Sequence, residues 1–403
     1  MAVDHGREAW SRRVAHETTL SRRPALAAQP FARNGSLADF ILALKPRLCH
    51  NLVSEACFER ILTIARWLPP WLNCGFECHL NAPEKSVDFL VLAHDRTLDC
   101  SLPGLDPASD LANFISAHPI WSRIKDLCIS CNTPGSLLEE SLTDIWWEFD
   151  LHTTSPTYLI PNVFMGTREV PTGTDLSAVR AASTRYRRVM GAALSQLVSP
   201  ALTAEPLTTA TECYERMGGE AVGFEVGVML ARETKLLRLF MRNVPKDRLG
   251  DCLVTLGWPG SVEKLEDCLS GLLELADCVG LDIDVGESIS PKVGIELGFG
   301  RRILPAQGKE HEKWVRLFDA LVSAHLCLVA KRDALVGWPG GARLTTNYDL
   351  QWKGFRLSDY PIYRALSHIK IVIEPGQPLS AKAYFGFIPV DKVHLGCRAV
   401  GSL

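Results

Sequence analysis

The sequence predicts an α+β fold in which five antiparallel β-hairpins close into a ten-stranded β-barrel surrounded by α-helices. Two observations lead to this prediction. Five stretches with paired runs of strand-forming residues alternate along the chain with segments of helical periodicity. In the first strand of each hairpin, polar residues recur at every second position, which places them on one face of the sheet.

Composition narrows the class of protein. The chain has 403 residues, 47% of them hydrophobic, and a formal net charge of −3. A dedicated nucleic-acid-binding protein normally has a basic excess, so no nucleic-acid partner is expected. No apolar run reaches the ~18 residues that a membrane span needs, and the amino end lacks the apolar core of a signal peptide. We therefore expect a cytoplasmic protein whose 13 cysteines are mostly buried, reduced thiols.

The amino-terminal segment differs from the rest of the chain. Residues 1–35 contain two Arg-Arg pairs and few large apolar residues, so we expect a mobile tail there and a single domain over 36–403. Helical spacing begins at 37–44 and resumes at 53–68, where Pro69 and Pro70 end it. Further helical segments are expected between the hairpins, at residues 110–129, 175–197, 262–276 and 310–336.

Hairpins are expected at residues 75–93, 144–167, 221–243, 278–300 and 367–387. Most of their joints are rich in Pro, Gly, Ser or Asn, which are turn-forming residues. The second joint, residues 152–157, is long for a hairpin. The alternating polar residues of the first strands are Glu77 and His79, Glu148 and Asp150, Glu225, Asp282 and Asp284, and His368 and Lys370. The returning strands have the same alternation at Arg238 and Arg242, Lys292 and Glu296, and Lys382 and Tyr384.

Two arrangements would produce this alternation. An open antiparallel sheet can expose its polar face to water and cover its apolar face with helices. Alternatively, the sheet closes into a barrel with the polar face inside. Closure is favoured because ten strands are near the size at which an open sheet curls or splits. The polar set also mixes acids, bases, His and Tyr, and a barrel of more than eight strands leaves a lumen for such residues.

Five helix–strand–strand–helix units around a ten-stranded barrel resemble the aromatic prenyltransferases called ABBA or PT-barrel enzymes. Lys382-Ala383-Tyr384 is similar to the Lys-x-Tyr pairs of that family, and the run from Lys235 to Arg242 is similar to its basic central strand. The resemblance implies that Lys, Arg and Tyr side chains hold an allylic diphosphate in the lumen. It also implies that Glu77 orients the nucleophile, which is an aromatic ring or a peptide side chain.

Candidate site residues follow from the inward alternation. Arg238, Arg242, Lys370 and Lys382, with Tyr384, would neutralise a diphosphate through charge-assisted hydrogen bonds. Pairing of each base with an acid on the adjacent strand would equally explain them. Glu77 and His79 are candidates for the catalytic base, since burial in an apolar cavity raises the pKa of a carboxyl group. Solvation in the lumen is the competing explanation for this pair.

The remaining candidates concern metal and substrate. Asp282 and Asp284 form an Asp-x-Asp that could hold a hard cation such as Mg²⁺, although solvated carboxylates explain it as well. The predicted reaction requires no cofactor. Glu148 and Glu225 are expected to contact substrate from the same face. Trp146 is a candidate for shielding a cation by its aromatic face, and packing in the core is its alternative role.

The inferred lumen is rich in acid, which keeps other functions open. Its carboxylates are Glu77, Asp88, Glu148, Asp150, Glu225, Asp282, Asp284 and Glu296. Like charges repel strongly at low dielectric, so Mg²⁺ must bridge acid and phosphate, or the acids pair with bases, or the substrate is cationic. Besides a prenyltransferase, the sequence therefore allows a binding or maturation protein that holds a cationic peptide. A peptide-modifying lyase or cyclase on the same scaffold is a third possibility.

Overall fold

The computed structural model describes residues 36–66, 68, 73–84, 86–95, 117–151, 156–167, 176–218, 221, 223–232, 234–299, 309–343, 351–352, 355–356 and 361–389. All of them belong to one compact unit, Asn34–Leu403. The expected mobile tail, residues 1–35, lies outside the described residues, so the division into tail and single domain stays a prediction.

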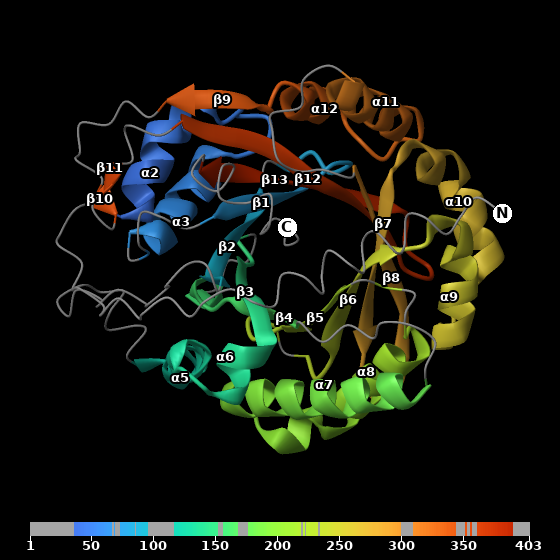
Figure 1. The fold of residues 1–403 in the computed structure, drawn as a ribbon. Coiled ribbons are helices and arrows are strands. Elements are labelled where there is room, and N and C mark those ends of the chain that lie inside the picture. Colours follow the sequence, from blue (N-terminus) through green and yellow to red (C-terminus); the bar gives the residue numbers. More distant parts are fainter. Residues whose placement is uncertain are drawn as a thin grey trace. The chain divides into compact units, whose positions relative to one another are not determined.

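Ten antiparallel strands form a closed barrel, which confirms the predicted fold class (Figure 1). Neighbouring strands pair in chain order, and the ring closes where β13 pairs with both β12 and β1. Each expected hairpin is present, including the one with the long joint. The strands are β1 (Cys74–His79), β2 (Val87–Asp95), β3 (Leu142–Phe149), β4 (Asn162–Thr167), β5 (Gly223–Val228), β6 (Leu237–Val244), β7 (Cys278–Val285), β8 (Ile289–Gly298), β12 (Pro361–Ile373) and β13 (Ser380–Pro389).

Three short strands were not expected from the sequence. Strand β9 (Gly340–Arg343) pairs with the beginning of β12, and β10 (Gln351–Trp352) pairs with β11 (Phe355–Arg356). Besides β13, strand β12 pairs with two strands along its length. Its first residues pair with β9, and its later residues pair with β8. The change of partner occurs near a β-bulge between Leu366 and His368.

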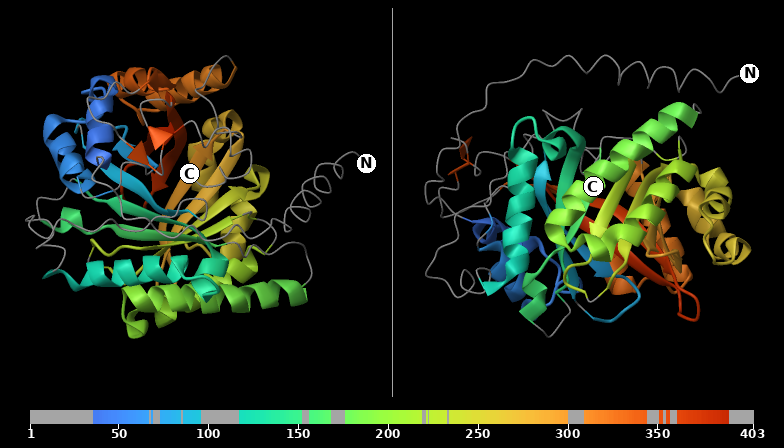
Figure 2. Two further views of the ribbon diagram at one scale, coloured as in Figure 1. Left: turned by 60° about the vertical axis from the view of Figure 1, so that its left-hand side comes forward. Right: turned by 90° about the horizontal axis from the view of Figure 1, so that it is seen from below.

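Helices surround the barrel on its outer side (Figures 1 and 2). Helix α8 packs on β6 and β7, and α7 packs on α8. The helices are α2 (Leu37–Leu44), α3 (Glu55–Ala65), α5 (Pro119–Asn132), α6 (Leu137–Ser141), α7 (Leu176–Leu197), α8 (Pro200–Arg216), α9 (Leu249–Leu256), α10 (Val262–Leu275), α11 (Lys309–Ser323) and α12 (Val329–Val336). Short 3-10 turns occur at Lys45–Arg47, Pro156–Leu159 and Lys246–Arg248.

Local signals explain several helix ends. Ser54 accepts a hydrogen bond from the amide of Cys57 and so begins α3, and Ser261 does the same for α10. Helix α9 ends at Gly257, whose φ of 82° is the left-handed conformation that glycine tolerates. The expectation of one helical segment over 310–336 is wrong, because α11 ends at Ser323 and α12 begins at Val329. Between them, His325 has a φ of 58°. Helices α6, α8 and α9 were not expected.

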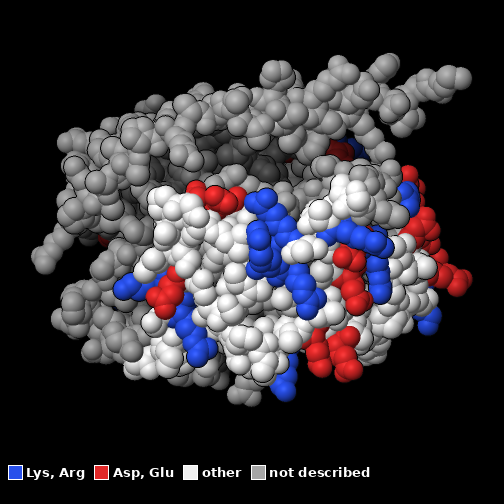
Figure 3. Space-filling view, turned by 60° about the horizontal axis from the view of Figure 1, so that its bottom comes forward, with Lys and Arg blue, Asp and Glu red and all other residues white. Residues whose placement is uncertain are grey.

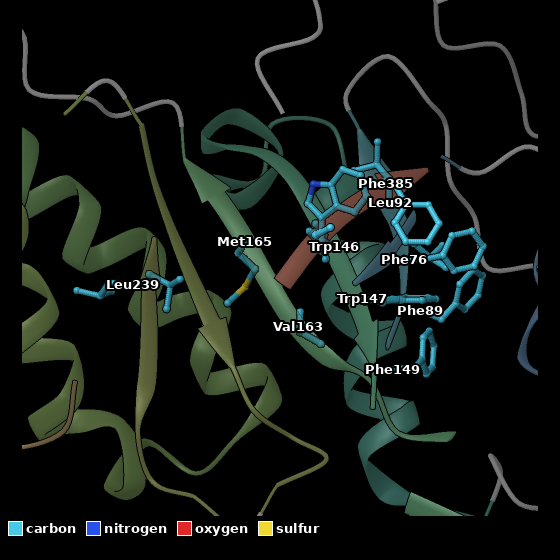
Figure 4. Close-up of a cluster of buried hydrophobic side chains, with 14 of the residues drawn as sticks. Phe76, Phe89, Leu92, Trp146, Trp147, Phe149, Val163, Met165, Leu239 and Phe385 are labelled. Atoms are coloured by element: carbon cyan, nitrogen blue, oxygen red, sulfur yellow. The ribbon is translucent and has the colours of Figure 1, made fainter. Parts of the chain in front are cut away.

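The hydrophobic core lies between the barrel and the helices. Phe76, Phe89 and Phe149 of β1, β2 and β3 gather on one side of these strands (Figure 4). Trp121 of α5 meets Trp147 of β3 edge to face, with ring centroids 5.7 Å apart. Burial of each such large apolar side chain stabilises the fold by about 1.5–3 kcal/mol. Most outward residues of the strands are thus used for packing, and the opposite positions face the lumen.

The outer surface of the helices is charged. Figure 3 shows the face that carries α7 and α8, where basic and acidic side chains lie among uncharged ones. Helix α7 contributes Arg180, Arg185, Arg187 and Arg188 and no acidic residue. Across the described part of the chain, no helix combines the length and apolarity of a membrane span. The cysteines there are free thiols, most of them buried.

Candidate active site in the barrel lumen

A cavity of about 920 Å³, including its open mouth, lies in the lumen. It is nearer the end of the barrel at which the first strand of each hairpin begins, because Cys74, Gly75 and Glu225 line it while the hairpin turns do not. Residues from every strand of the ring contribute to it. Its lining is Cys74, Gly75, Phe76, Leu90, Trp146, Glu148, Phe164, Glu225, Phe240, Arg242, Asp282, Glu296, Ala365, Leu366, Ser367, His368, Lys370, Tyr384, Phe385 and Gly386.

The candidate residues fall into two groups. Those that line the cavity are Trp146, Glu148, Glu225, Arg242, Asp282, Lys370 and Tyr384. Those outside its lining are Glu77, His79, Arg238, Asp284 and Lys382. Hydrogen bonds and ion pairs join the two groups, because Tyr384 contacts Glu77 and Arg238 contacts Asp282. The period-two alternation therefore brings the set together, although it does not place every member in the cavity.

Aromatic side chains form much of the cavity wall. Trp146, Phe164, Phe240 and Tyr384 come from four different strands. Two glycines make room for them: a Cβ at Gly227 would lie 2.5 Å from the Phe164 ring, and a Cβ at Gly280 would lie 2.8 Å from the Phe240 ring. Aromatic faces stabilise a neighbouring cation through the ring quadrupole. The wall therefore suits a ligand that is apolar, cationic or both.

Trp146 and Trp147 show how the alternation divides the two sides of the barrel. Trp147 packs outward on Trp121, whereas Trp146 lines the cavity.

Two glycines that face each other on β1 and β13, Gly75 and Gly386, occupy inward positions of the barrel. A Cβ at Gly386 would lie 2.5 Å from the carbonyl oxygen of Cys74, so this close approach of the two strands requires glycine. Without side chains there, the cavity extends to the backbone.

A ladder of ion pairs crosses the lumen. Lys370 Nζ lies 2.6 Å from Asp282 Oδ2 and 3.6 Å from Glu296 Oε1. Arg238 Nε lies 2.8 Å from Asp284 and 3.3 Å from Asp282, so Asp282 is shared between two cations. This pairing is the alternative that the sequence left open for the basic residues. The pKa values of Lys370 and Arg238 are raised, because these carboxylates outweigh the effect of burial, which alone would lower them.

Glu77 is held differently from the expectation for a catalytic base. It accepts hydrogen bonds from Lys382 Nζ and from the Tyr384 hydroxyl. Burial alone would raise the pKa of Glu77, but Lys382 and Lys370 outweigh burial and hold it well below its ordinary range. The expectation of a raised pKa at Glu77 is therefore wrong. A carboxylate this acidic is a poor proton acceptor near neutral pH.

Glu148 has the raised pKa that was expected at Glu77. It is buried in the cavity wall, and burial followed by the charge of Glu77 raises its pKa to about 7. Arg232 opposes this shift from a distance of 3.2 Å. A carboxyl group that titrates near neutral pH can accept and return a proton during turnover. Glu148 is thus the acid–base candidate among the predicted carboxylates.

Arg242 and Glu225 form an ion pair in the cavity wall. The pKa of Arg242 is lowered because burial outweighs the attraction of Asp144 and Glu296. The guanidinium also lies 5.6 Å from the centroid of the Phe240 ring. Lys370 likewise lies over a ring, 5.1 Å from the centroid of Tyr384. Among the described residues, Arg242 and Lys370 are the lysine and arginine side chains that line the cavity and could contact an anionic ligand.

The carboxylates of both candidate metal sites are already paired with other groups. Asp282 and Asp284 are both engaged by Arg238, and Asp282 also by Lys370, so this pair does not fit a divalent cation. Within the described residues, Glu77, His79 and Asp88 do bring three donor atoms within 4.8 Å of one another. However, Glu77 already binds Lys382, and Asp88 accepts the amide hydrogen of Leu151 at 3.1 Å. Neither group offers a set of uncommitted ligands.

Several cavity residues were not among the predicted site residues. Phe164 and Phe240 were missed because an aromatic residue on a strand usually indicates the outward, packed face. Arg232 contacts Glu148 and Asp150 without lining the cavity, and it was missed because it lies in the β5–β6 turn, where no periodicity indicates a contact with the lumen. Glu296 and His368 were expected to face inward but had no assigned role. Ser367 was assigned to no face.

The closed ring of five hairpins inside a layer of helices is the ABBA, or PT-barrel, prenyltransferase-like fold. No protein-family model and no curated protein matches the sequence. Among solved structures, the prenyltransferase PriB in its apo form is similar, with 13% identity, a TM-score of 0.48, and coverage of 87% of this chain and 96% of PriB.

Two other solved structures have comparable values. The ternary complex of PriB with L-tryptophan and dimethylallyl thiolodiphosphate has 14% identity, a TM-score of 0.47, and coverage of 87% of this chain and 96% of that chain. The 5-dimethylallyltryptophan synthase from Streptomyces coelicolor has 11% identity, a TM-score of 0.42, and coverage of 87% and 97%, respectively. The fold assignment rests on the strand pairing of this chain.

Proposed function

We propose that the protein is a transferase that moves a prenyl group from an allylic diphosphate to an aromatic acceptor inside the barrel. The observation that carries this proposal is the aromatic wall formed by Trp146, Phe164, Phe240 and Tyr384. An allylic cation needs aromatic faces that stabilise it and a lumen that limits its access to water. An aromatic side chain of a peptide would meet the same requirements as a small aromatic acceptor.

The diphosphate is assigned to Lys370 and Arg242. Both line the cavity, and each lies beside an aromatic ring against which the prenyl group would pack. When the allylic C–O bond breaks, its electron pair leaves with the diphosphate, and charge-assisted hydrogen bonds stabilise the developing charge. Because both cations contact carboxylates in the free protein, the diphosphate must replace Asp282, Glu296 and Glu225 as their partners. The other predicted bases, Arg238 and Lys382, then act by holding this network together.

Glu148 is assigned to the acceptor. Its carboxylate lies in the aromatic wall and can accept a hydrogen bond from a ring N–H or O–H group. That contact directs the nucleophilic face of the ring towards the allylic carbon. Asp282 and Asp284 are both paired with Arg238, and Asp282 is also paired with Lys370. This pairing supports a transfer reaction that does not require a metal ion. We expect added Mg²⁺ to change the rate of transfer less than tenfold.

The test is product formation by the full chain. The protein is incubated with allylic diphosphates of increasing length and a panel of indoles, phenols and aromatic peptides, and products are identified by mass spectrometry. Lys370→Met should lower the affinity for a non-hydrolysable thiolodiphosphate by about tenfold to a hundredfold, because it removes a charged contact. The matched control is Lys264→Met on the exposed surface of α10. Absence of both product and thiolodiphosphate binding would reject the proposal.

A second candidate is a protein that binds a cationic peptide without chemistry. In the part of the chain that the structure describes, four carboxylates line the cavity, Glu148, Glu225, Asp282 and Glu296, against the two cations Arg242 and Lys370. Carboxylates beside aromatic faces suit an ammonium or guanidinium group. Protection of the fold by Lys- or Arg-containing peptides, lost in Glu225→Gln and retained in Lys370→Met, would favour this candidate. Protection by the thiolodiphosphate alone would favour the transferase.

A further inference from the structure

A β-bulge in β12 lies in the wall of the cavity. In a regular strand, successive side chains point to opposite faces. Here the register with β13 shifts between Leu366 and His368, and both Ser367 and His368 line the cavity. Bulges of this kind re-aim side chains and are common beside active sites.

Ser367, His368 and Glu296 lie in series, joined by one hydrogen bond and one contact at ion-pair distance. Ser367 Oγ lies 2.9 Å from His368 Nδ1, and His368 Nε2 lies 3.3 Å from Glu296 Oε2. The three come from two strands that are paired at this point, with His368 opposite Gly298 on β8. Because a carboxylate only accepts, we assign the hydrogen of the neutral imidazole to Nε2, the ring nitrogen nearer Glu296. With this assignment, Nδ1 accepts the hydrogen of the Ser367 hydroxyl.

The surroundings hold the imidazole in place. Its ring stacks on Tyr384, with centroids 4.1 Å apart and an interplanar angle of 23°. Lys370 contacts the other oxygen of Glu296 at 3.6 Å and lies over the same tyrosine ring. The charged and titratable groups around His368 are thus Glu296 of β8, Lys370 of β12 and Tyr384 of β13. A base whose orientation is fixed in this way needs little reorganisation when a proton arrives.

We propose that Ser367, His368 and Glu296 form the proton relay of the cavity. The inference rests on the proposed function for the identity of the substrate. Transfer joins the allylic carbon to a ring carbon of the acceptor, and that carbon then carries a surplus hydrogen. Its proton passes to Ser367 Oγ while the hydroxyl proton of Ser367 passes to His368 Nδ1. The C–H electron pair restores the aromatic ring, and Glu296 pairs with the imidazolium.

The relay and Glu148 have different roles in the proposed reaction. Glu148 lies on β3, whereas the relay lies on β8 and β12. Glu148 orients the acceptor through its N–H or O–H group, and the relay removes the proton from carbon. Ser367 and His368 touch the reacting atoms directly or through one hydroxyl, while Glu296 is a positioning residue. Loss of the relay should therefore lower turnover and leave diphosphate binding unchanged.

Turnover of four variants tests the relay. Ser367→Ala and His368→Gln should each lower turnover by about a hundredfold to ten-thousandfold, the usual contribution of a general base. Ser367→Thr keeps the hydroxyl and should remain within about tenfold of the unchanged protein, and thiolodiphosphate affinity should stay within about twofold in all three. The matched control is Ser323→Ala on the exposed surface of α11, which should have no effect. Unchanged turnover in Ser367→Ala would overturn the relay.

A measurement without turnover separates failure of the relay from failure of the proposed function. NMR of the full chain with isotope-labelled histidine reports which ring nitrogen of His368 carries hydrogen. The relay requires hydrogen on Nε2 in the unchanged protein and in Ser367→Ala, and a mixture of tautomers in Glu296→Gln. Hydrogen on Nδ1, donated to Ser367, would overturn the relay whether or not prenyl transfer occurs. Hydrogen on Nε2 with no prenyl transfer would support the relay and reject the proposed substrate.

Discussion

Arg232 reaches from the β5–β6 turn into the lumen and holds Asp150 by two hydrogen bonds of 2.6 Å. The same guanidinium lies 3.2 Å from Glu148 in the cavity wall. Asn162 adds a bond of 3.2 Å to Asp150. One turn residue thus ties the hairpin end of the lumen to the proposed substrate site. The first two predictions concern this connection.

Arg232→Met should destabilise the fold by about 3 kcal/mol, because it leaves the buried charge of Asp150 without its cation. The double variant Arg232→Met with Asp150→Asn should regain most of that loss, since it removes the uncompensated charge as well. Urea unfolding of the three proteins measures both effects. Equal stability of Arg232→Met and the unchanged protein would show that the ion pair contributes nothing.

Glu148 should make stability depend on pH between 4.5 and about 7. Its pKa is raised in the folded state, so the folded protein binds this proton more tightly than the unfolded chain does. The free energy of unfolding should therefore fall as pH rises through this window, by up to about 3 kcal/mol. Glu148→Gln stays neutral and should remove that part of the slope. An unchanged slope in the variant would contradict the raised pKa.

Glu77→Gln should destabilise the fold, because Lys382 and Lys370 lose the carboxylate that compensates them. We expect a loss of about 3–5 kcal/mol, as for other buried pairs with one partner removed. The pKa of Glu77 is lowered on folding, so its contribution is present above pH 4.5 and disappears as pH falls through the lower, folded-state pKa. Adding Lys382→Met to Glu77→Gln should restore part of the stability. The loss should therefore shrink in acid, which unfolding at two pH values can measure.

Gly227→Ala should change the shape of the cavity. Its Cβ would lie 2.5 Å from the Phe164 ring, which must move from the aromatic wall. We expect a cost of about 1–3 kcal/mol from overpacking, together with weaker thiolodiphosphate binding. The control is Gly271→Ala on α10, where a Cβ meets nothing within 4 Å and alanine should stabilise the helix by about 0.5–1 kcal/mol. Equal effects of the two substitutions would contradict the packing around Phe164.

The strand alternation was sufficient to predict the barrel and much of its lumen. Glu148, Asp282 and Lys370 face one cavity because period two continues without interruption along the relevant part of each strand. The depth of each residue along the barrel could not be predicted, since it depends on strand stagger. Arg238 and Lys382 were grouped with Lys370, although both lie outside the cavity lining. Lys382 lies directly opposite Lys370 in the strand register, so the difference between these two residues follows from side-chain contacts.

The bulge in β12 and the turn residue Arg232 could not be predicted from the period-two alternation of the strands. A bulge adds one residue and changes the alternation, so Ser367 could not be assigned to the cavity from period two. Arg232 depends on a long side chain that folds back from a turn, and no periodicity describes such a contact. The pKa difference between Glu77 and Glu148 depends on which acid has the nearer cations, and that follows only from three-dimensional distances.

The central claim is that the aromatic cavity binds an allylic diphosphate. A crystal structure of the full chain with a non-hydrolysable allylic thiolodiphosphate tests it most directly. We predict the prenyl group against Trp146 and Phe240, and the diphosphate in contact with Lys370 and Arg242, which have left Asp282 and Glu225. A thiolodiphosphate bound outside the barrel, or a cavity that remains closed by these ion pairs at saturating ligand, would contradict the account.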